Sequence, residues 1–335
     1  MKIIHTYSEI RGGVIDKRNL YMMTLSLLLI NKHYGKTKLY TDKENAKIIK
    51  EIGLPYDEID DTLLNDFKTN TFSIPKLLVY SEQKEPFIHI DLDAFLFYKI
   101  DFNKENVIYG SFNEGLNYVS KLNGGFIGFY NTYLHNTFRL LDRLDDEFKD
   151  NIYFNEVPNM SVFGGYQNDL ISNASRYCLD LYEKNKLFFD NNYYNACIIE
   201  QLFIPTAMKM MDKNTTFQFL HDQNKIINIE FGDSNDLNEY PIYIKKGLEN
   251  LKTIKDDIDL CGTIFNEFYG FLHLFGSKMS NKIISILRGK IILEMKGIKY
   301  INKIDEICSE NLGIEYDIDY YNDLIKQYNR RRNVI

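Results

Sequence analysis

Strand and helix signals alternate along the first part of the sequence, and this order constrains the fold more than any other feature. Residues 2–6 are predicted to form a strand, 16–34 a helix and 37–41 a second strand. Hydrophobic stretches at 86–97 and 107–111 are predicted to add further strands. This alternation is typical of a wound α/β sheet, and it is not the pattern of a sandwich or a helical bundle. We therefore expect an α/β fold with a sheet flanked by helices.

Three further helices are predicted, two of them from capping residues. Asp42 is expected to be the N-cap of a helix that runs to Ile52. Ser73 is expected to cap the next helix, with Pro75 in its first turn. A third helix is predicted over 131–144. Between the first two, the sequence shows no regular pattern.

The hydrophobic stretch at 86–97 contains two carboxylates, Asp91 and Asp93. Side chains at i and i+2 of a strand point to the same face, so a strand that continued through both would make them converge. Converging carboxylate oxygens suit a hard divalent cation. The alternative is that the two aspartates cap the following turn.

Composition and charge narrow the function classes. The formal net charge of −7 disfavours a general nucleic-acid binder. The four cysteines are scattered without a Cys-x-x-Cys pair, which favours a reduced cytoplasmic protein over a disulfide or zinc framework. The N-terminus lacks the features of a signal peptide, and the longest apolar run, 20–30, is too short to span a bilayer. We therefore expect a cytoplasmic location.

Two glycine pairs are candidate ligand-binding elements. Gly124 and Gly125 follow Asn123, and Gly164 and Gly165 follow a short hydrophobic run. Glycine leaves room for a ligand or for a crossing backbone, and it also serves bends and bulges where no ligand binds. Neither pair belongs to a phosphate-binding loop or a dinucleotide-binding fingerprint, which disfavours a Rossmann dehydrogenase.

Three polar residues in the second half of the sequence are further candidates. His273 ends an apolar run, and its imidazole could ligate Mn²⁺, while Lys278 could contact phosphate. Glu200 interrupts apolar residues. Its default interpretation is an exposed position on a helix, and the alternative is a polar pocket.

Taken in order, these motifs resemble the GT-A class of nucleotide-sugar glycosyltransferases, most closely the retaining glycosyltransferase family 8, which includes glycogenin and the bacterial lipopolysaccharide galactosyltransferases. That family carries a His-x-x-Gly-x-Lys motif well over a hundred residues after its Asp-x-Asp, and here 180 residues separate Asp93 from His273. Leu122-Asn123-Gly124-Gly125 is similar to a family motif whose Asn contacts the donor sugar. Lys76 occupies the position of a basic residue that serves the donor. The resemblance covers roughly residues 1 to 280.

The sequence departs from family 8 in one motif and resembles a second family in another. The family 8 histidine motif usually continues Lys-Pro-Trp, whereas Lys278 is followed by Met279 and Ser280 and the chain has no tryptophan. Gly165 and Glu200, 35 residues apart, are similar in spacing to a Gly-Gly strand and a glutamate of the blood-group transferases. The stereochemistry and the role of Glu200 therefore stay open.

The resemblance implies a GT-A (Rossmann-like) mixed sheet in a catalytic domain over 1–279, followed by a helical C-terminal extension over 280–335. It implies metal-dependent transfer of a sugar, with retention, from a UDP-linked donor to a hydroxyl acceptor, in glycan or surface polysaccharide synthesis. Mn²⁺ or Mg²⁺ would be ligated by Asp91, Asp93 and His273. Glu200 and Gln201 would lie at the anomeric centre. The residues expected to bind the donor are His5, Thr6, Tyr7, Lys76, Asp91, Asn123, Gly124, Gly125, Gly164, Gly165 and Lys278.

Two alternatives belong to other functional classes. A GT-A-like sugar nucleotidyltransferase would carry a basic, Gly-rich loop after the first strand, which only Arg11-Gly12-Gly13 resembles. A non-catalytic nucleotide-sugar-binding protein would keep the fold alone. The expected partners are a nucleotide-sugar donor and a glycan, lipid-linked or protein acceptor, with no nucleic acid. Arg330-Arg331-Arg332 is either solvated or makes a weak peripheral contact with an anionic membrane.

Overall fold

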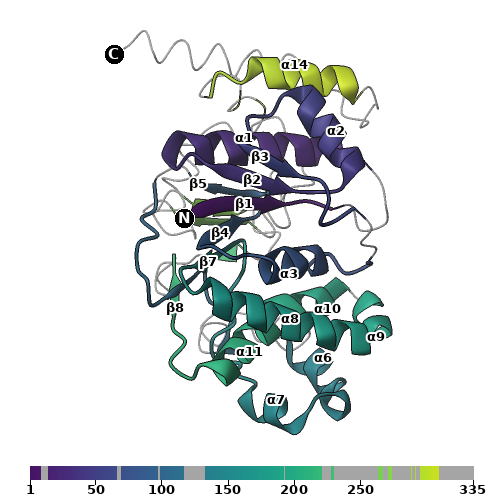
Figure 1. Cartoon of the computed structure of the whole chain (residues 1–335), viewed down its shortest axis with the longest axis vertical. Coiled ribbons are helices and arrows are strands. Elements are labelled where there is room, and N and C mark those ends of the chain that lie inside the picture. The colour runs from purple at the N-terminus through teal and green to yellow at the C-terminus, as the bar shows by residue number, and fades with distance from the viewer. Residues whose placement is uncertain are drawn as a thin grey trace.

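The computed structural model describes residues 1–8, 14–65, 69–96, 99–116, 133–191, 193–220, 228–229, 263–266, 271–273, 288, 291 and 295–308. These residues form a seven-stranded sheet of order β3-β2-β1-β4-β7-β6-β8 and a four-stranded sheet of order β5-β11-β10-β9 (Figure 1). The larger sheet is mixed and is flanked by helices, which confirms the predicted fold class. The strands are β1 (Lys2–Thr6), β2 (Thr37–Tyr40), β3 (Glu58–Asp60), β4 (Phe87–Ile90), β5 (Ala94–Leu96), β6 (Ile108–Gly110), β7 (Val162–Gly165), β8 (Phe217–Phe219), β9 (Asn228–Ile229), β10 (Thr263–Asn266) and β11 (Phe271–His273).

Helices lie on both faces of the larger sheet, α1 on one face and α3 with α8 on the other (Figure 1). A π-helix, η3, joins α10 to α11. The helical elements are α1 (Lys17–His33), α2 (Lys43–Ile52), α3 (Ile74–Ser81), α6 (His135–Phe138), η2 (Leu141–Arg143), α7 (Asp146–Asn151), α8 (Asn168–Lys184), α9 (Lys186–Asp190), α10 (Tyr193–Cys197), η3 (Ile198–Phe203), α11 (Ile204–Met211) and α14 (Ile298–Ile307).

The register of the larger sheet decides which loops meet. Strands β3, β2, β1 and β4 are parallel, so their carboxyl ends lie along one edge. Strand β7 is antiparallel to β4 and pairs Val162 with Ile90. The amino end of β7 therefore lies beside the carboxyl end of β4. Residues just after Ile90 and just before Val162 are brought together at this edge, where ligands of open α/β sheets bind.

The glycine pair of β7 has a role inside the sheet. Gly164 and Gly165 have φ angles of +136° and +155°, a conformation that L side chains rarely adopt. A Cβ on Gly164 would lie 2.2 Å from the carbonyl oxygen of Phe87. The two glycines pair with Ile88 and Phe87, at the opposite end of β4 from Asp91. Close packing of the strands explains them, and their predicted contact with a donor stays untested.

Local capping rules hold for the first two helices and fail for the third. The Asp16 and Asp42 side chains accept hydrogen bonds from the backbone of the first turns of α1 and α2, and Gly53 ends α2 in the left-handed conformation. Ser73 makes no capping bond, contrary to the prediction. Its hydroxyl donates instead to the carbonyl of Ala196 at 2.9 Å, which ties α3 to α10.

Three further predictions differ from the structure. The strand at 86–97 is two strands, because β4 ends at Ile90 and β5 begins at Ala94. The three-residue edge strand β3 forms where the sequence shows no pattern. The helix predicted over 131–144 is interrupted after α6, where the chain turns before the short 3₁₀ helix η2.

The helix α14 completes a hydrophobic core on the face covered by α1. Tyr300, Ile301 and Ile304 pack in the same buried cluster as apolar residues of α1 and α2. Asp305 accepts a hydrogen bond from Tyr21 at 2.5 Å and pairs with Lys17 at 2.7 Å. The helical periodicity predicted after residue 280 is present over Ile298–Ile307, and the domain boundary at 279/280 stays a prediction.

Within the described ranges, none of the helices combines the length and the hydrophobicity that crossing a bilayer requires. Three cysteines fall in these ranges, Cys178, Cys197 and Cys308, and no disulfide joins them.

Candidate active site

The Asp-x-Asp segment forms a turn between two strands. Asp91 follows the last residue of β4, and its backbone carbonyl accepts a hydrogen bond from Ala94 at 3.0 Å. The chain therefore turns at Asp91, Leu92 and Asp93, and the strand alternation assumed for the two carboxylates does not apply. The side chain of Asp91 is 17% exposed, and Asp93 is buried.

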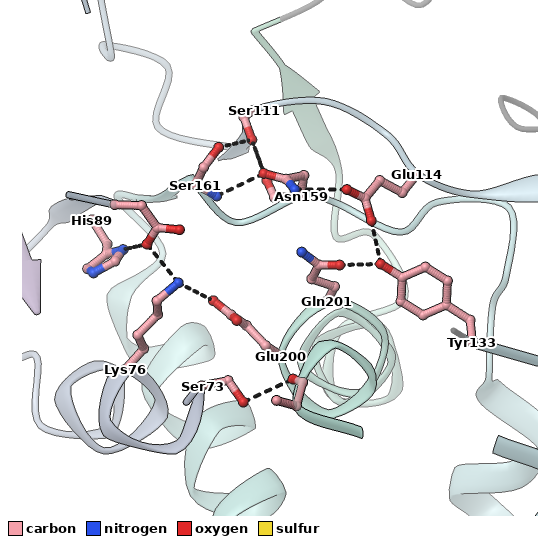
Figure 2. A network of polar contacts seen from close by, with 12 residues as sticks. Ser73, Lys76, His89, Ser111, Glu114, Tyr133, Asn159, Ser161, Glu200 and Gln201 are labelled. Carbon is pink, nitrogen blue, oxygen red and sulfur yellow. Dashed lines mark hydrogen bonds and ion pairs between the residues drawn. The ribbon is translucent and has the colours of Figure 1, made fainter. Parts of the chain in front are cut away.

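One lysine joins two carboxylates from distant parts of the chain. Lys76 on α3 places its Nζ 2.7 Å from Asp91 Oδ1 and 3.1 Å from Glu200 Oε1 (Figure 2). All three side chains are largely buried, and Glu200 is only 2% exposed. The default interpretation of Glu200 as an exposed residue is therefore wrong, and the polar-pocket alternative holds.

Burial controls the protonation of this cluster. Burial raises the pKa of Glu200 to about 7, although the charge of Lys76 opposes the rise. Burial also acts against a charged Lys76, but the charges of Asp91 and Glu200 hold its pKa well above the ordinary value. Lys76 therefore stays cationic, while Glu200 exchanges its proton near neutral pH.

His89 lies on β4 next to this cluster, with Nδ1 3.6 Å from Asp91 Oδ1. Its side chain is completely buried, and burial together with the charge of Lys76 lowers its pKa well below the ordinary value. His89 is therefore neutral and adds no positive charge beside Asp91.

The π-helix η3 carries both predicted catalytic residues. Glu200 directs its side chain toward Lys76, and Gln201 directs its amide toward Tyr133 (Figure 2). Neighbouring residues of one helix thus contact opposite sides of the site. π-Helical turns are rare, and they occur frequently at functional sites.

A chain of hydrogen bonds continues from Gln201. The hydroxyl of Tyr133 contacts both Gln201 Oε1 and Glu114 Oε2 (Figure 2). Asn159 Nδ2 donates to Glu114 Oε1 at 2.8 Å. Asn159 Oδ1 accepts from the backbone N–H of Ser161 at 3.1 Å. These contacts connect η3 to the segment that enters β7.

The two sets of contacts close into one ring. The backbone N–H of Asp91 donates to the carbonyl of Ser161 at 2.8 Å, which links the hydrogen-bonded chain to the ion cluster. The hydroxyl of Ser111 braces this link, because it lies 2.7 Å from the backbone carbonyl oxygen of Asn159 and 2.8 Å from Asn159 Oδ1 and can donate to either. We call the whole set the polar ring, and its members are Lys76, Asp91, Ser111, Glu114, Tyr133, Asn159, Ser161, Glu200 and Gln201.

The residues predicted to bind the donor at the end of β1 are not members of this ring. His5 Nδ1 lies 2.7 Å from the Tyr56 hydroxyl and Nε2 lies 3.3 Å from Ser26 Oγ. Burial lowers the pKa of His5 to about 3, so the imidazole is a neutral core group. Thr6 is nearly buried, and the backbone N–H of Tyr7 donates to Tyr40. Their predicted role in binding the donor stays a prediction.

The second sheet brings His273 to Asp93. Strand β11 runs antiparallel to β5, and His273 is the register partner of Ala94, the residue after Asp93. The side chain of His273 lies outside the described part of the structure. Within the side chains that are described, no three His, Cys, Asp or Glu form a group that could hold a metal ion.

The placement of Asp93 and His273 nevertheless fits Mn²⁺ or Mg²⁺ in one respect. Carboxylate oxygen suits both ions, imidazole suits Mn²⁺, and the β5–β11 register pairs His273 with the residue that follows Asp93. Asp91 differs, because Lys76 already engages its Oδ1. The metal assignment therefore stays a prediction that concerns Asp93 and His273 first.

Four predicted donor residues, Asn123, Gly124, Gly125 and Lys278, lie outside the described residues. Conversely, five members of the polar ring were not predicted, namely Ser111, Glu114, Tyr133, Asn159 and Ser161. A sequence pattern could have identified most of them, because polar residues directly follow the short strand β6 and directly precede the Gly-Gly strand β7.

Solved structures similar to this chain include three transferases. Mouse xyloside xylosyltransferase 1 has a TM-score of 0.34 and 10% identity, over 65% of this chain and 84% of that chain. The glycosyltransferase GlyE of Streptococcus pneumoniae has a TM-score of 0.41 and 10% identity, over 92% of this chain and 63% of that chain. The galactosyltransferase LgtC, solved with donor and acceptor sugar analogs, has a TM-score of 0.39 and 9% identity, over 87% and 96%. Similarity at this level does not by itself assign an activity.

Sequence comparison places the chain in a family. No curated protein sequence matches it at a significant level. The family described as "Family of unknown function (DUF6734)" matches residues 1–281, which include both sheets and the whole polar ring. The chain therefore belongs to the DUF6734 family.

Proposed function

We propose that the protein is a metal-dependent glycosyltransferase that moves a sugar from a nucleotide diphosphate sugar to a hydroxyl acceptor. UDP as the nucleotide, retention as the stereochemical outcome and a glycan, lipid-linked or protein acceptor are part of this proposal, and they rest on the sequence resemblance. The observation that carries the proposal is the buried Asp91–Lys76–Glu200 cluster at the carboxyl end of β4.

The chemistry of glycosyl transfer explains why such a cluster is useful. The reacting anomeric carbon develops positive charge, which a nearby carboxylate stabilises, as in the glycosidases. Glu200 has a pKa of about 7, so it becomes an anion near neutral pH, and Lys76 fixes its position. The carboxylate and amide groups around it can hydrogen-bond to sugar hydroxyls. The polar ring thus offers both the charge and the orientation that a sugar donor needs.

The remaining residues have separable tasks in this mechanism. Lys76 pairs with both Glu200 and Asp91 and thereby fixes the positions of the two carboxylates. Gln201 presents its amide to the sugar from the same helix. A divalent cation held by Asp93 and His273 would supply Lewis-acid assistance to the departing diphosphate.

The experiment is a screen of nucleotide sugars for hydrolysis in the presence and absence of Mn²⁺, with wild type beside Asp93→Ala. We expect wild type to hydrolyse a UDP-sugar only with the metal, and Asp93→Ala to lose this activity while its circular dichroism spectrum stays unchanged. Asp61→Ala is the control, because Asp61 pairs at the surface with Lys50 and should leave hydrolysis unaffected.

Three outcomes would contradict the proposal. If wild type kept full turnover with a chelator present, the metal would have no part in the proposed reaction. Formation of a nucleotide sugar from a sugar phosphate and a nucleoside triphosphate would favour the nucleotidyltransferase alternative. Calorimetry with Mn²⁺ provides the third test. If no nucleotide sugar bound, the protein would have the fold without the activity.

A further inference from the structure

A line of hydrogen bonds runs from the segment before β3 to the Asp-x-Asp turn, on the face of the larger sheet that α1 covers. Tyr56 Oη lies 2.7 Å from His5 Nδ1, and His5 Nε2 lies 3.3 Å from Ser26 Oγ on α1. The hydroxyl of Ser26 donates to the carbonyl oxygen of Ala94 at 2.8 Å. Ala94 directly follows Asp93. We call Tyr56, His5, Ser26 and Ala94 the His5 relay.

The chemistry of each group fixes the direction of these bonds. A carbonyl oxygen only accepts, so the single proton of the Ser26 hydroxyl is used on Ala94. Ser26 Oγ then accepts from His5, which places the imidazole proton on Nε2. Burial lowers the pKa of His5 to about 3, so the ring carries only this one proton. His5 Nδ1 is therefore an acceptor, and the Tyr56 hydroxyl donates to it.

The short contact with Tyr56 also fixes the orientation of the ring. If the imidazole were turned over, a ring carbon would lie where Nδ1 lies 2.7 Å from the hydroxyl oxygen, which is closer than carbon and oxygen pack. Burial raises the pKa of Tyr56 well above its ordinary value, so the phenol keeps the proton that it donates. The opposite tautomer, with its proton on Nδ1, would draw the Ser26 proton from Ala94 to Nε2.

We propose that His5 is a positioning residue, which acts through Ser26 on Ala94 and thereby holds the Asp-x-Asp turn in place for a divalent cation. Ala94 is held at both of its backbone polar groups, because its N–H donates to the carbonyl of Asp91 at 3.0 Å and its carbonyl accepts from Ser26. It is also the register partner of His273. The cation belongs to the proposed function, whereas the relay can be tested without metal or donor.

The His5 relay and the ion cluster hold the turn from opposite faces of the sheet. Successive side chains of a strand alternate between its two faces. Ile4 packs in the hydrophobic cluster that includes residues of α3, whereas the neighbouring His5 contacts Ser26 of α1. Asp91 is engaged by Lys76, which α3 carries. An ion pair therefore holds the turn on one face, and the His5 relay holds it on the other.

Nitrogen NMR spectroscopy of the protein without added metal tests the relay itself. We expect the His5 ring to carry its proton on Nε2 at about pH 7, with the His5 signals assigned from their loss in His5→Gln. Tyr182→Phe is the control and should keep this state, because another buried tyrosine there loses a hydroxyl that is bonded to Asp190. A proton on Nδ1 in wild type, or an exchanging mixture of the two forms, would overturn the proposal.

Binding of Mn²⁺ alone, followed by electron paramagnetic resonance, tests the positioning. Tyr56→Phe keeps the aromatic ring and removes the proton donated to His5, and Ser26→Ala removes the bond to Ala94. We expect each variant to keep the circular dichroism spectrum of wild type and to bind Mn²⁺ about tenfold more weakly. Tyr182→Phe should bind Mn²⁺ as wild type does. Wild-type affinity in both Tyr56→Phe and Ser26→Ala would overturn the proposal.

The two measurements separate the failure of this role from the failure of the proposed function. If wild type bound no Mn²⁺, the metal-dependent function would be contradicted together with the cation at the turn, whatever the tautomer of His5. If wild type bound Mn²⁺ and the relay variants bound it equally well, only the positioning role of His5 would be contradicted.

Discussion

The two sides of the polar ring hold their groups by different physical means. On one side, a single cation, Lys76, lies between the buried carboxylates Asp91 and Glu200. On the other side, Glu114, Tyr133 and Gln201 are joined by hydrogen bonds alone. The first side sets a charge that depends on pH, whereas the second sets the direction of an amide. The difference teaches that one site holds its groups in two ways, and that the two sides influence each other less than burial influences either.

Removing the cation should have the largest effect. We expect Lys76→Met to lower the free energy of unfolding by about 3–5 kcal/mol, because it leaves buried carboxylates without their counter-ion. Urea unfolding measures this change. Lys50→Met is the matched control, since Lys50 pairs with Asp61 at 2.8 Å but is exposed, and it should be nearly neutral. A similar loss in both variants would mean that burial does not distinguish the two pairs.

The pH dependence of stability should come from Glu200. Its pKa is raised from 4.5 in the unfolded chain to about 7 in the fold, so its contribution is fully present below about pH 4.5 and is lost as the pH rises through 7. The loss is on the order of 3 kcal/mol, because each unit of pKa shift corresponds to about 1.4 kcal/mol. Unfolding titrations between these pH values should show this slope in wild type and not in Glu200→Gln. An equal slope in both would assign the titration to another group.

Breaking the hydrogen-bonded side should cost less. Tyr133→Phe removes one hydroxyl and leaves the oxygens of Glu114 and Gln201 without that contact, for which we expect a loss of about 1–2 kcal/mol in unfolding free energy. Tyr177→Phe is the control, because its hydroxyl donates to Asp145 at an exposed position. The same urea series compares the two. A loss as large as that of Lys76→Met would contradict the separation of the two sides.

The smallest effect is expected just behind the ring. Ser73→Ala removes the bond to the Ala196 carbonyl that ties α3 to α10, and we expect a loss of about 0.5–1.5 kcal/mol. Because α3 carries Lys76 and α10 leads into η3, this variant should also shift the pKa of Glu200. Thermal unfolding measures the first change and the slope of stability against pH measures the second. An unchanged melting temperature would show that the tie is not needed.

Local rules explain why much of the fold is predictable from the sequence. Asp16, Asp42 and Gly53 act through their own helices, so their roles follow from neighbouring residues alone. The same rules do not predict the Asp-x-Asp turn, because strand alternation does not indicate that β4 ends at Ile90. They do not predict the strand β3 either, since its three partly exposed edge residues form no strong hydrophobic pattern.

The site is less predictable than the fold because its contacts are distant in sequence. Lys76 and Glu200 were each recognised through motifs, but 124 residues separate them and no local pattern pairs them. Glu114 carries no motif, and its partners Tyr133 and Asn159 lie 19 and 45 residues away. The role of such a residue becomes visible only when the sheet register brings β6 and β7 together.

The pairing of β5 with β11 has a consequence for the order in which the protein matures. Every member of the polar ring has been synthesised once residue 201 leaves the ribosome. The pairing of Ala94 with His273, in contrast, requires synthesis to continue to residue 273. A long loop must close before this strand pair forms, and such distant contacts form slowly. A nascent chain arrested after β8 should therefore already contain the polar ring but lack the second sheet. The proposed donor site would then form before the proposed metal site during translation.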